Sequence, residues 1–225
     1  MDRVDVAFIA GGITVMILSL LFYNHAFGDY LDLREDIIWT KNPVVCAGTS
    51  LQTADLYELG FNHNKIAKSI LTWKWKLQSY TLTKDYNYTL KWLESKSGVK
   101  SGCDIFIDLG ITKDAYGLTK CLHFTDGMKC AITIDRGVPS NYFLGTITHE
   151  MGHALGLGHR LSYTKCDFAA VVLSFDIMMQ QAGKHQKITD EDLKALIAQY
   201  GKNGFYEPNN YESYYPISEK PLRCA

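Results

Sequence analysis

The chain has 225 residues, of which 47% are hydrophobic and 21% are charged. This length allows one full domain with appendages but not two large domains, and the near-average composition argues against long disordered regions. The formal net charge is −1, so the sequence lacks the basic excess that nucleic-acid binding uses. We therefore expect no nucleic-acid partner.

An uncharged apolar segment, 6–23, follows a short N-terminal segment, 1–5. As a helix, residues 6–23 would extend roughly 27 Å, which approaches the thickness of the hydrocarbon core of a membrane. We predict a single-pass transmembrane signal anchor, which makes the membrane a partner of the chain. The alternatives are a signal peptide cleaved after Ala26, which would give a secreted protein, and a buried core helix.

All the cysteines follow this apolar segment: Cys46, Cys103, Cys121, Cys130, Cys166 and Cys224. An even number of cysteines beyond a membrane segment is typical of disulfide-bonded domains in an oxidising compartment. We predict an extracytoplasmic domain and one local disulfide, Cys121–Cys130. The alternative is a set of reduced thiols in a cytosolic domain.

The polar and acidic residues 24–42 are predicted to form a stalk before a single domain, 43–203. Apolar residues in 64–80 recur at intervals of four, three and four, which predicts an amphipathic helix. Short alternating or β-branched runs bounded by turn residues predict strands at 44–47, 86–92, 104–109 and 131–135.

Two further helices are predicted in the second half of the domain. Ser140 or Asn141 can cap a helix that carries the apolar residues after them. Thr189 and the three acidic residues that follow it predict the start of a last helix, which ends before Gly201. The tail, 204–225, is expected to be irregular. Strands mixed with helices predict an α/β or α+β domain.

Residues 149–159 read HEMGHALGLGH and carry the predicted chemistry. His149 and His153 are four positions apart, so on a helix they lie one turn apart on one face and can bind one zinc ion. A catalytic zinc site needs a third protein ligand, but on a continuing helix His159 would lie about 15 Å from His149 along the axis. Glycine readily adopts positive φ, so Gly156 can end the helix and let His159 return to the metal.

Glu150 follows the first ligand and is placed to contact a zinc-bound water rather than the zinc. Zinc lowers the pKa of such a water to about 7, and Glu150 can act as general base while the water attacks a carbonyl. We therefore predict a zinc-dependent metalloendopeptidase, a hydrolase with Zn²⁺ as its cofactor and a protein or peptide as its substrate. The alternative is a catalytically inactive, zinc-stabilised extracytoplasmic module that binds a peptide or partner without cleaving it.

The motif HEMGHALGLGH matches the HExxHxxGxxH signature of the metzincin metalloproteases and most resembles the matrixin branch, the matrix metalloprotease type. Metzincins also carry a methionine in a turn beneath the zinc. The segment 174–179 resembles that turn, with Met178 as the predicted methionine and Met179 as the alternative. Residues 192–201 are similar to the matrixin C-terminal helix, and the resemblance covers roughly residues 43–203.

The resemblance implies a metzincin-like zincin fold with a twisted mixed sheet, a zinc helix and a C-terminal helix. An antiparallel edge strand of that sheet would lie above the cleft and bind the substrate as an extended added strand. We expect this edge strand to contain Ala131, Ile132, Thr133 and Ile134; the alternative for this segment is an internal strand. The sequence does not indicate an oligomeric state.

Overall fold

The computed structural model describes residues 30–34, 36–94, 102–161, 176–179 and 186–205. Apart from Tyr30, the described residues belong to one compact unit that begins at Leu31. Among the described residues, no helix combines the length and apolar character needed to cross a membrane. The predicted anchor, 6–23, lies outside those residues, as do Cys166 and Cys224.

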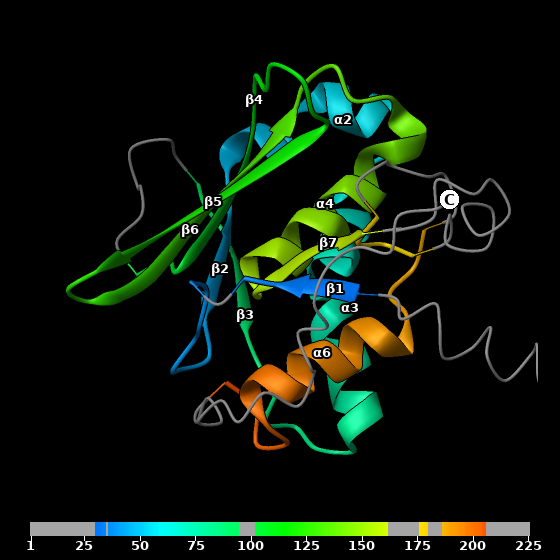
Figure 1. Cartoon of the computed structure of the whole chain (residues 1–225). Helices are drawn as coiled ribbons and strands as arrows, with labels where there is room; N and C mark the ends of the chain where they lie inside the picture. The colour runs from blue at the N-terminus through cyan, green and yellow to red at the C-terminus, as the bar shows by residue number, and fades with distance from the viewer. Residues whose placement is uncertain (1–29, 35, 95–101, 162–175, 180–185, 206–225) are drawn as a thin grey trace, which may run out of the picture. The chain divides into compact units, whose positions relative to one another are not determined.

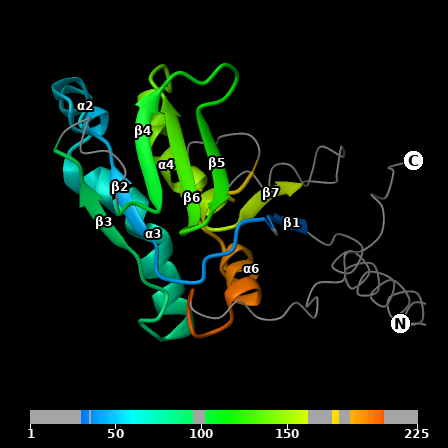
Figure 2. The same ribbon diagram turned by 90° about the vertical axis from the view of Figure 1, so that its left-hand side faces the viewer.

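A five-stranded mixed sheet forms the centre of the fold, with its strands in the order β3-β2-β4-β6-β5. Figure 2 shows this sheet with β3 at one side and β5 at the other. Four strands are parallel, and β5 runs antiparallel to β6 at the edge: β2 (Val44–Ala47), β3 (Thr89–Trp92), β4 (Ile105–Gly110), β5 (Gly117–Phe124) and β6 (Gly127–Asp135). The predicted mixed α/β class is confirmed.

Two long helices, α3 and α4, lie side by side on one face of this sheet (Figure 1). In α3 the predicted apolar stripe is buried, and the indole N–H of Trp73 in that stripe donates to the Thr148 carbonyl oxygen of α4 at 2.7 Å. A smaller two-stranded sheet pairs β1 with β7. The bounds of the helices and of this second sheet are η1 (Thr49–Gln52), α2 (Ala54–Glu58), α3 (His63–Thr81), α4 (Ser140–Ala154), α6 (Asp190–Tyr200), β1 (Tyr30–Leu33) and β7 (Leu157–Leu161).

The two predicted caps have different outcomes. Thr189 caps α6 as predicted: its side chain and that of Asp192 each bind the backbone N–H of the other residue, which forms a capping box. The prediction for α4 is wrong, because this helix begins at Ser140 itself and Pro139 occupies the capping position without a side-chain hydrogen bond. Ser140 therefore lies inside the first turn.

The prediction that Ala131, Ile132, Thr133 and Ile134 form the edge strand is wrong. These residues belong to β6, which lies between β4 and β5, and the antiparallel edge strand is β5. Residues 131–134 pair with β4 on one side and with β5 on the other. On the face of the sheet that α4 covers, Ile132 and Ile134 are 1% and 0% exposed, as is typical of an internal strand. The strand β5 carries a polar, exposed pattern that the sequence analysis did not assign.

The predicted stalk, 24–42, is also corrected, since its second half belongs to the domain. Ile37 and Trp39 are 0% and 1% exposed and lie in the main hydrophobic core. The Trp39 indole N–H donates to the Ala154 carbonyl oxygen at 2.8 Å. The prediction of a stalk was based on the acidic composition of the whole segment, which did not reveal that these two apolar side chains are buried.

Within the described part of the chain, two disulfides link segments of the main sheet. The predicted Cys121–Cys130 disulfide is confirmed and links β5 to β6 at directly opposite positions. A second disulfide joins Cys46 to Cys103 with a Cα–Cα distance of 5.7 Å. It could not be predicted, because 57 residues separate the two cysteines and only the parallel pairing of β2 with β4 brings them together.

Candidate metal centre

Three histidines converge at the end of α4. His149 and His153 lie on the helix and His159 lies on β7, and one ring nitrogen from each falls within 4.8 Å of the other two. This group can hold a metal ion. The two helical ligands meet because positions four apart lie one turn apart on the same face of a helix.

The chain reverses between α4 and β7 at the predicted glycine. Gly156 has a φ of +107°, a conformation that side chains with a Cβ rarely adopt. A Cβ at this position would also lie 2.7 Å from the Gln199 side-chain amide and 2.9 Å from the Ile37 carbonyl oxygen. This reversal brings His159 back toward the helix, as the sequence analysis predicted.

Carbonyl oxygens orient two of the imidazole rings. The Nδ1 atom of His149 lies 2.6 Å from the Ile177 carbonyl oxygen, and that of His153 lies 2.7 Å from the Leu157 carbonyl oxygen. Each contact assigns the ring proton to Nδ1 and leaves the Nε2 lone pair for a metal, which is the usual arrangement of a metal-binding histidine. The Nε2 atoms of His153 and His159 face each other at 3.2 Å.

Burial keeps these imidazoles neutral. Desolvation lowers the pKa of His149 to about 4, although its hydrogen bond to Ile177 acts in the opposite direction. Desolvation also lowers the pKa of His153 to about 3, and the charge of His149 adds to this effect. Since a histidine binds metal in its neutral form, both rings are in the binding form at neutral pH.

Glu150 lies beside the histidines with its carboxylate under the edge strand. Its side chain is 5% exposed, and Oε2 accepts a hydrogen bond from the Thr119 hydroxyl of β5 at 2.6 Å. Burial raises the pKa of Glu150 to about 7, and the Thr119 hydrogen bond only partly offsets this. A carboxyl group with a pKa near neutrality can both accept and return a proton at neutral pH.

Met178 packs against α4, the helix that carries His149 and His153. A Cβ at Gly152, between the two helical histidines, would lie 2.5 Å from the Met178 sulfur, so only glycine allows this close approach. Met178 is fully buried, whereas its neighbour Met179 lines the cleft. The segment that contains Met178 also supplies the Ile177 carbonyl that orients His149.

A buried polar network holds this segment in place. Asp176 accepts a hydrogen bond from the Met178 N–H at 2.7 Å and another from the Thr189 hydroxyl at 3.0 Å. Thr189 is the cap of α6, and Asp192 of the same capping box lies 3.0 Å from that hydroxyl. The start of α6 therefore fixes the turn that orients His149.

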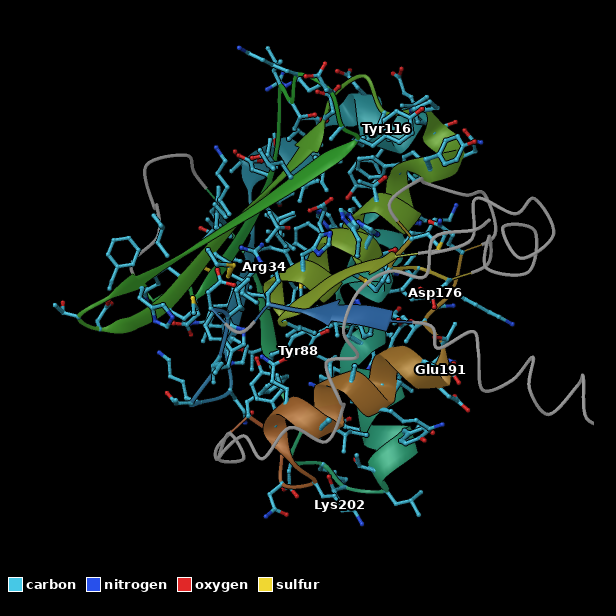
Figure 3. The ribbon with its side chains drawn as sticks, in the orientation of Figure 1. Arg34, Tyr88, Tyr116, Asp176, Glu191 and Lys202 are labelled. Carbon is cyan, nitrogen blue, oxygen red and sulfur yellow. A yellow bond between two sulfur atoms is a disulfide. The ribbon has the colours of Figure 1, made fainter. Side chains whose placement is uncertain are left out.

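An open cleft of about 940 Å³ contains the three histidines and Glu150. The start of β5, the loop before it and the first turns of α4 line this cleft, and Arg34 lines it from the end of β1. Figure 3 shows Tyr116 near the start of β5 and Arg34 at the end of β1, and both residues line the cleft.

Sequence reasoning missed three residues that shape this site: Arg34, Thr119 and Asp176. Thr119 had no local signal, because in β5 the apolar Leu118 and Leu122 are exposed and the polar Thr119 is buried, the reverse of the usual pattern of a half-buried strand. Arg34 reaches the cleft through long-range contacts that no motif encodes. Asp176 lies in the segment 174–179 that resembles the methionine turn, but its hydrogen bond with Thr189 joins this segment to α6 and was not predicted.

No family model matches the chain, and no curated protein matches it significantly. The resemblance to metzincins therefore depends on the motif 149–159 and on the geometry around it.

Proposed function

We propose that this protein is a zinc-dependent metalloendopeptidase of the metzincin type. The observation that carries the proposal is the convergence of three histidine nitrogens beside the buried Glu150 carboxylate in an open cleft. A catalytic zinc site uses three protein ligands and leaves one position open, whereas a structural site has four protein ligands. Among the described residues, the group that can hold a metal has three members.

The donor set fits zinc. His149, His153 and His159 would hold the ion through neutral imidazole nitrogens, and nitrogen ligands in a set of three suit a catalytic zinc. Zinc, when bound, polarises a substrate carbonyl and makes water a nucleophile at neutral pH.

Glu150 is the general base in this proposal. Its place next to His149 on α4 directs its carboxylate to the same cleft without making it a fourth ligand. Thr119 donates to Oε2 and so holds the carboxylate on the β5 side of the cleft. Glu150 accepts a proton from the attacking water and returns it to the leaving amine.

The edge strand β5 is the proposed binding strand for the peptide, in place of residues 131–134. Its partner in the sheet is β6, and the residues at its start, Gly117, Leu118 and Thr119, line the cleft. An extended peptide can add to such an edge through main-chain hydrogen bonds.

We place the catalytic domain outside the cytoplasm, on a single-pass anchor at 6–23 or, if the anchor is cleaved, in a secreted form. The two disulfides support an oxidising compartment. The membrane and a protein or peptide substrate are the proposed partners.

The test uses the full chain in detergent micelles with zinc and a peptide library whose new ends are identified by mass spectrometry. We expect the parent to cleave internal peptide bonds and Glu150→Gln to lose this cleavage while it still binds zinc. No cleavage by the parent, with zinc bound, would instead support the inactive peptide-binding module. Equal cleavage by Glu150→Gln would contradict the role of this residue.

A further inference from the structure

Arg34 brings a positive charge into the cleft from a segment that precedes the main sheet. It follows β1, and β1 pairs with β7, the strand that carries His159. The Arg34 N–H donates to the Gly156 carbonyl oxygen at 2.8 Å, so its main chain is held beside the turn that positions His159. The chemistry proposed above makes no use of this residue.

The Arg34 guanidinium has capacity for another acceptor. Its side chain is 32% exposed, and among the described residues it forms an ion pair, at 3.2 Å, with Asp36, whose side chain is 62% exposed. An ion pair this open to water contributes little. A guanidinium carries five N–H donors in a planar fork that matches a carboxylate. A substrate carboxylate can therefore bind beside Asp36 or replace it.

The segment that contains Arg34 and Asp36 lies near one end of β5, and this position indicates which part of a bound peptide would contact Arg34. Thr119, in the first half of β5, contacts Glu150 at 2.6 Å, whereas His123, near the end of β5, contacts the Asp36 carbonyl oxygen at 2.8 Å. A peptide that adds antiparallel to β5, the commoner pairing, runs from the His123 side to the Thr119 side. It therefore passes the Arg34 segment before it reaches Glu150.

We propose that Arg34 is a specificity-determining residue that binds an acidic side chain, Asp or Glu, in the part of the substrate before the scissile bond. The inference rests on the proposed peptidase function. Since a strand advances about 3.4 Å per residue, the interval between Thr119 and His123 places the acidic residue about two to four positions before that bond. The charge and fork geometry of arginine favour a carboxylate over neutral polar groups.

The test uses peptides in which a single aspartate is moved stepwise along an uncharged sequence. Binding is measured by fluorescence anisotropy on the zinc-loaded full chain with Glu150→Gln, which keeps the peptides intact, and cleavage is measured on the parent. We expect one or two adjacent aspartate positions to bind about tenfold more tightly than the uncharged peptide, as one charge-assisted hydrogen bond provides. Arg34→Glu should remove this gain and favour lysine at the same position.

Two further variants sharpen the comparison. Lys194→Glu replaces a positive by a negative charge in the same way, but Lys194 is exposed on α6 and does not line the cleft, so the aspartate preference should persist. Asp36→Ala removes the competing carboxylate and should increase the gain. It leaves the main-chain contact of this residue with His123 in place.

Each outcome separates this inference from the proposed function. Cleavage by the parent with no aspartate preference, or a preference that survives Arg34→Glu, would overturn the role of Arg34 and leave the peptidase intact. An aspartate preference located after the scissile bond would overturn the proposed placement. No cleavage, but an aspartate gain that Arg34→Glu removes, would overturn the peptidase and retain Arg34 as a peptide-binding residue. Neither binding nor cleavage of any peptide would overturn both.

Discussion

Glu150 in the cleft and Asp104 at the start of β4 are both buried acids, 5% and 3% exposed, but their partners differ. Glu150 accepts a side-chain hydrogen bond from the neutral Thr119 hydroxyl. Asp104 accepts the Val44 N–H at 2.9 Å and pairs with Lys41 and Lys129 at 3.0 and 3.2 Å. The two carboxyl groups are therefore equally buried, but Glu150 has a neutral side-chain partner and Asp104 has two cationic ones.

The pKa values of the two carboxyl groups move in opposite directions. Desolvation raises the pKa of Glu150 to about 7. Desolvation acts on Asp104 in the same sense, but the Val44 N–H and the two lysines outweigh it, and the pKa of Asp104 lies below its usual value. Asp104 is thus a fixed charge that joins neighbouring strands, whereas Glu150 is suited to exchange a proton. This contrast predicts that one acid serves activity and the other serves stability.

Glu150→Gln should cause a large loss of peptide cleavage. We expect kcat/KM to fall by about 10²–10⁴-fold, the usual contribution of a general base, with zinc content and the urea-unfolding midpoint unchanged. Glu191→Gln is the matched control, because Glu191 is exposed on α6 and should leave cleavage unaffected. A large loss of stability in Glu150→Gln would remove the distinction between the two acids.

Asp104→Ala should show the reverse behaviour. It leaves the Val44 N–H without its acceptor and removes the anion that Lys41 and Lys129 share, although Lys129 keeps its ion pair with Asp126, so we expect the free energy of unfolding to fall by about 2 kcal/mol. Urea unfolding measures this change, and cleavage per folded molecule should remain at the parent level. Unchanged stability would show that the pairs around Asp104 contribute nothing net.

Thr119→Val should have a smaller effect on activity. The substitution keeps the shape of the side chain but removes the hydroxyl that holds the Glu150 carboxylate. We expect kcat to fall by about tenfold, equivalent to one hydrogen bond to a charged group, with little change in KM. A rise in KM at constant kcat would instead assign Thr119 to substrate binding.

The decrease in the free energy of unfolding at acidic pH should depend in part on Asp104. Because its pKa is lowered in the folded state, Asp104 stabilises the fold above its unfolded pKa of about 3.9, and this contribution is lost as the pH falls through the lower folded value. The stability difference between the parent and Asp104→Asn should be constant from about pH 7 to pH 5 and shrink below about pH 4. A difference that persists at the lowest pH would contradict this.

The sequence predicted what local pattern encodes. The stripe on α3, the Thr189 cap of α6 and the three histidines with Gly156 each depend on residues a few positions apart, and the structure places all of them as expected. Helix periodicity and backbone conformation are local properties, so one chain suffices to read them.

The sequence did not predict what depends on pairing between distant segments. The choice of β5 rather than β6 as the edge strand is a property of the whole sheet, and an apolar alternating run fits either position. Likewise, Ile37 and Trp39 enter the core from an acidic segment through contacts with Gln199 and Ala154, and Arg34 lines the cleft beside the turn that precedes β7. These contacts can be predicted only when the three-dimensional fold is known.

We propose that one zinc ion, bound by His149, His153 and His159, supports peptide hydrolysis together with Glu150. The most direct measurement titrates the metal-free full chain with zinc and records the cleavage rate of a peptide at each addition. We expect no cleavage without zinc, a linear rise in the cleavage rate up to one equivalent of zinc per chain, and no such rise in His153→Ala. Cleavage that is independent of zinc, or no cleavage at one bound equivalent, would contradict it.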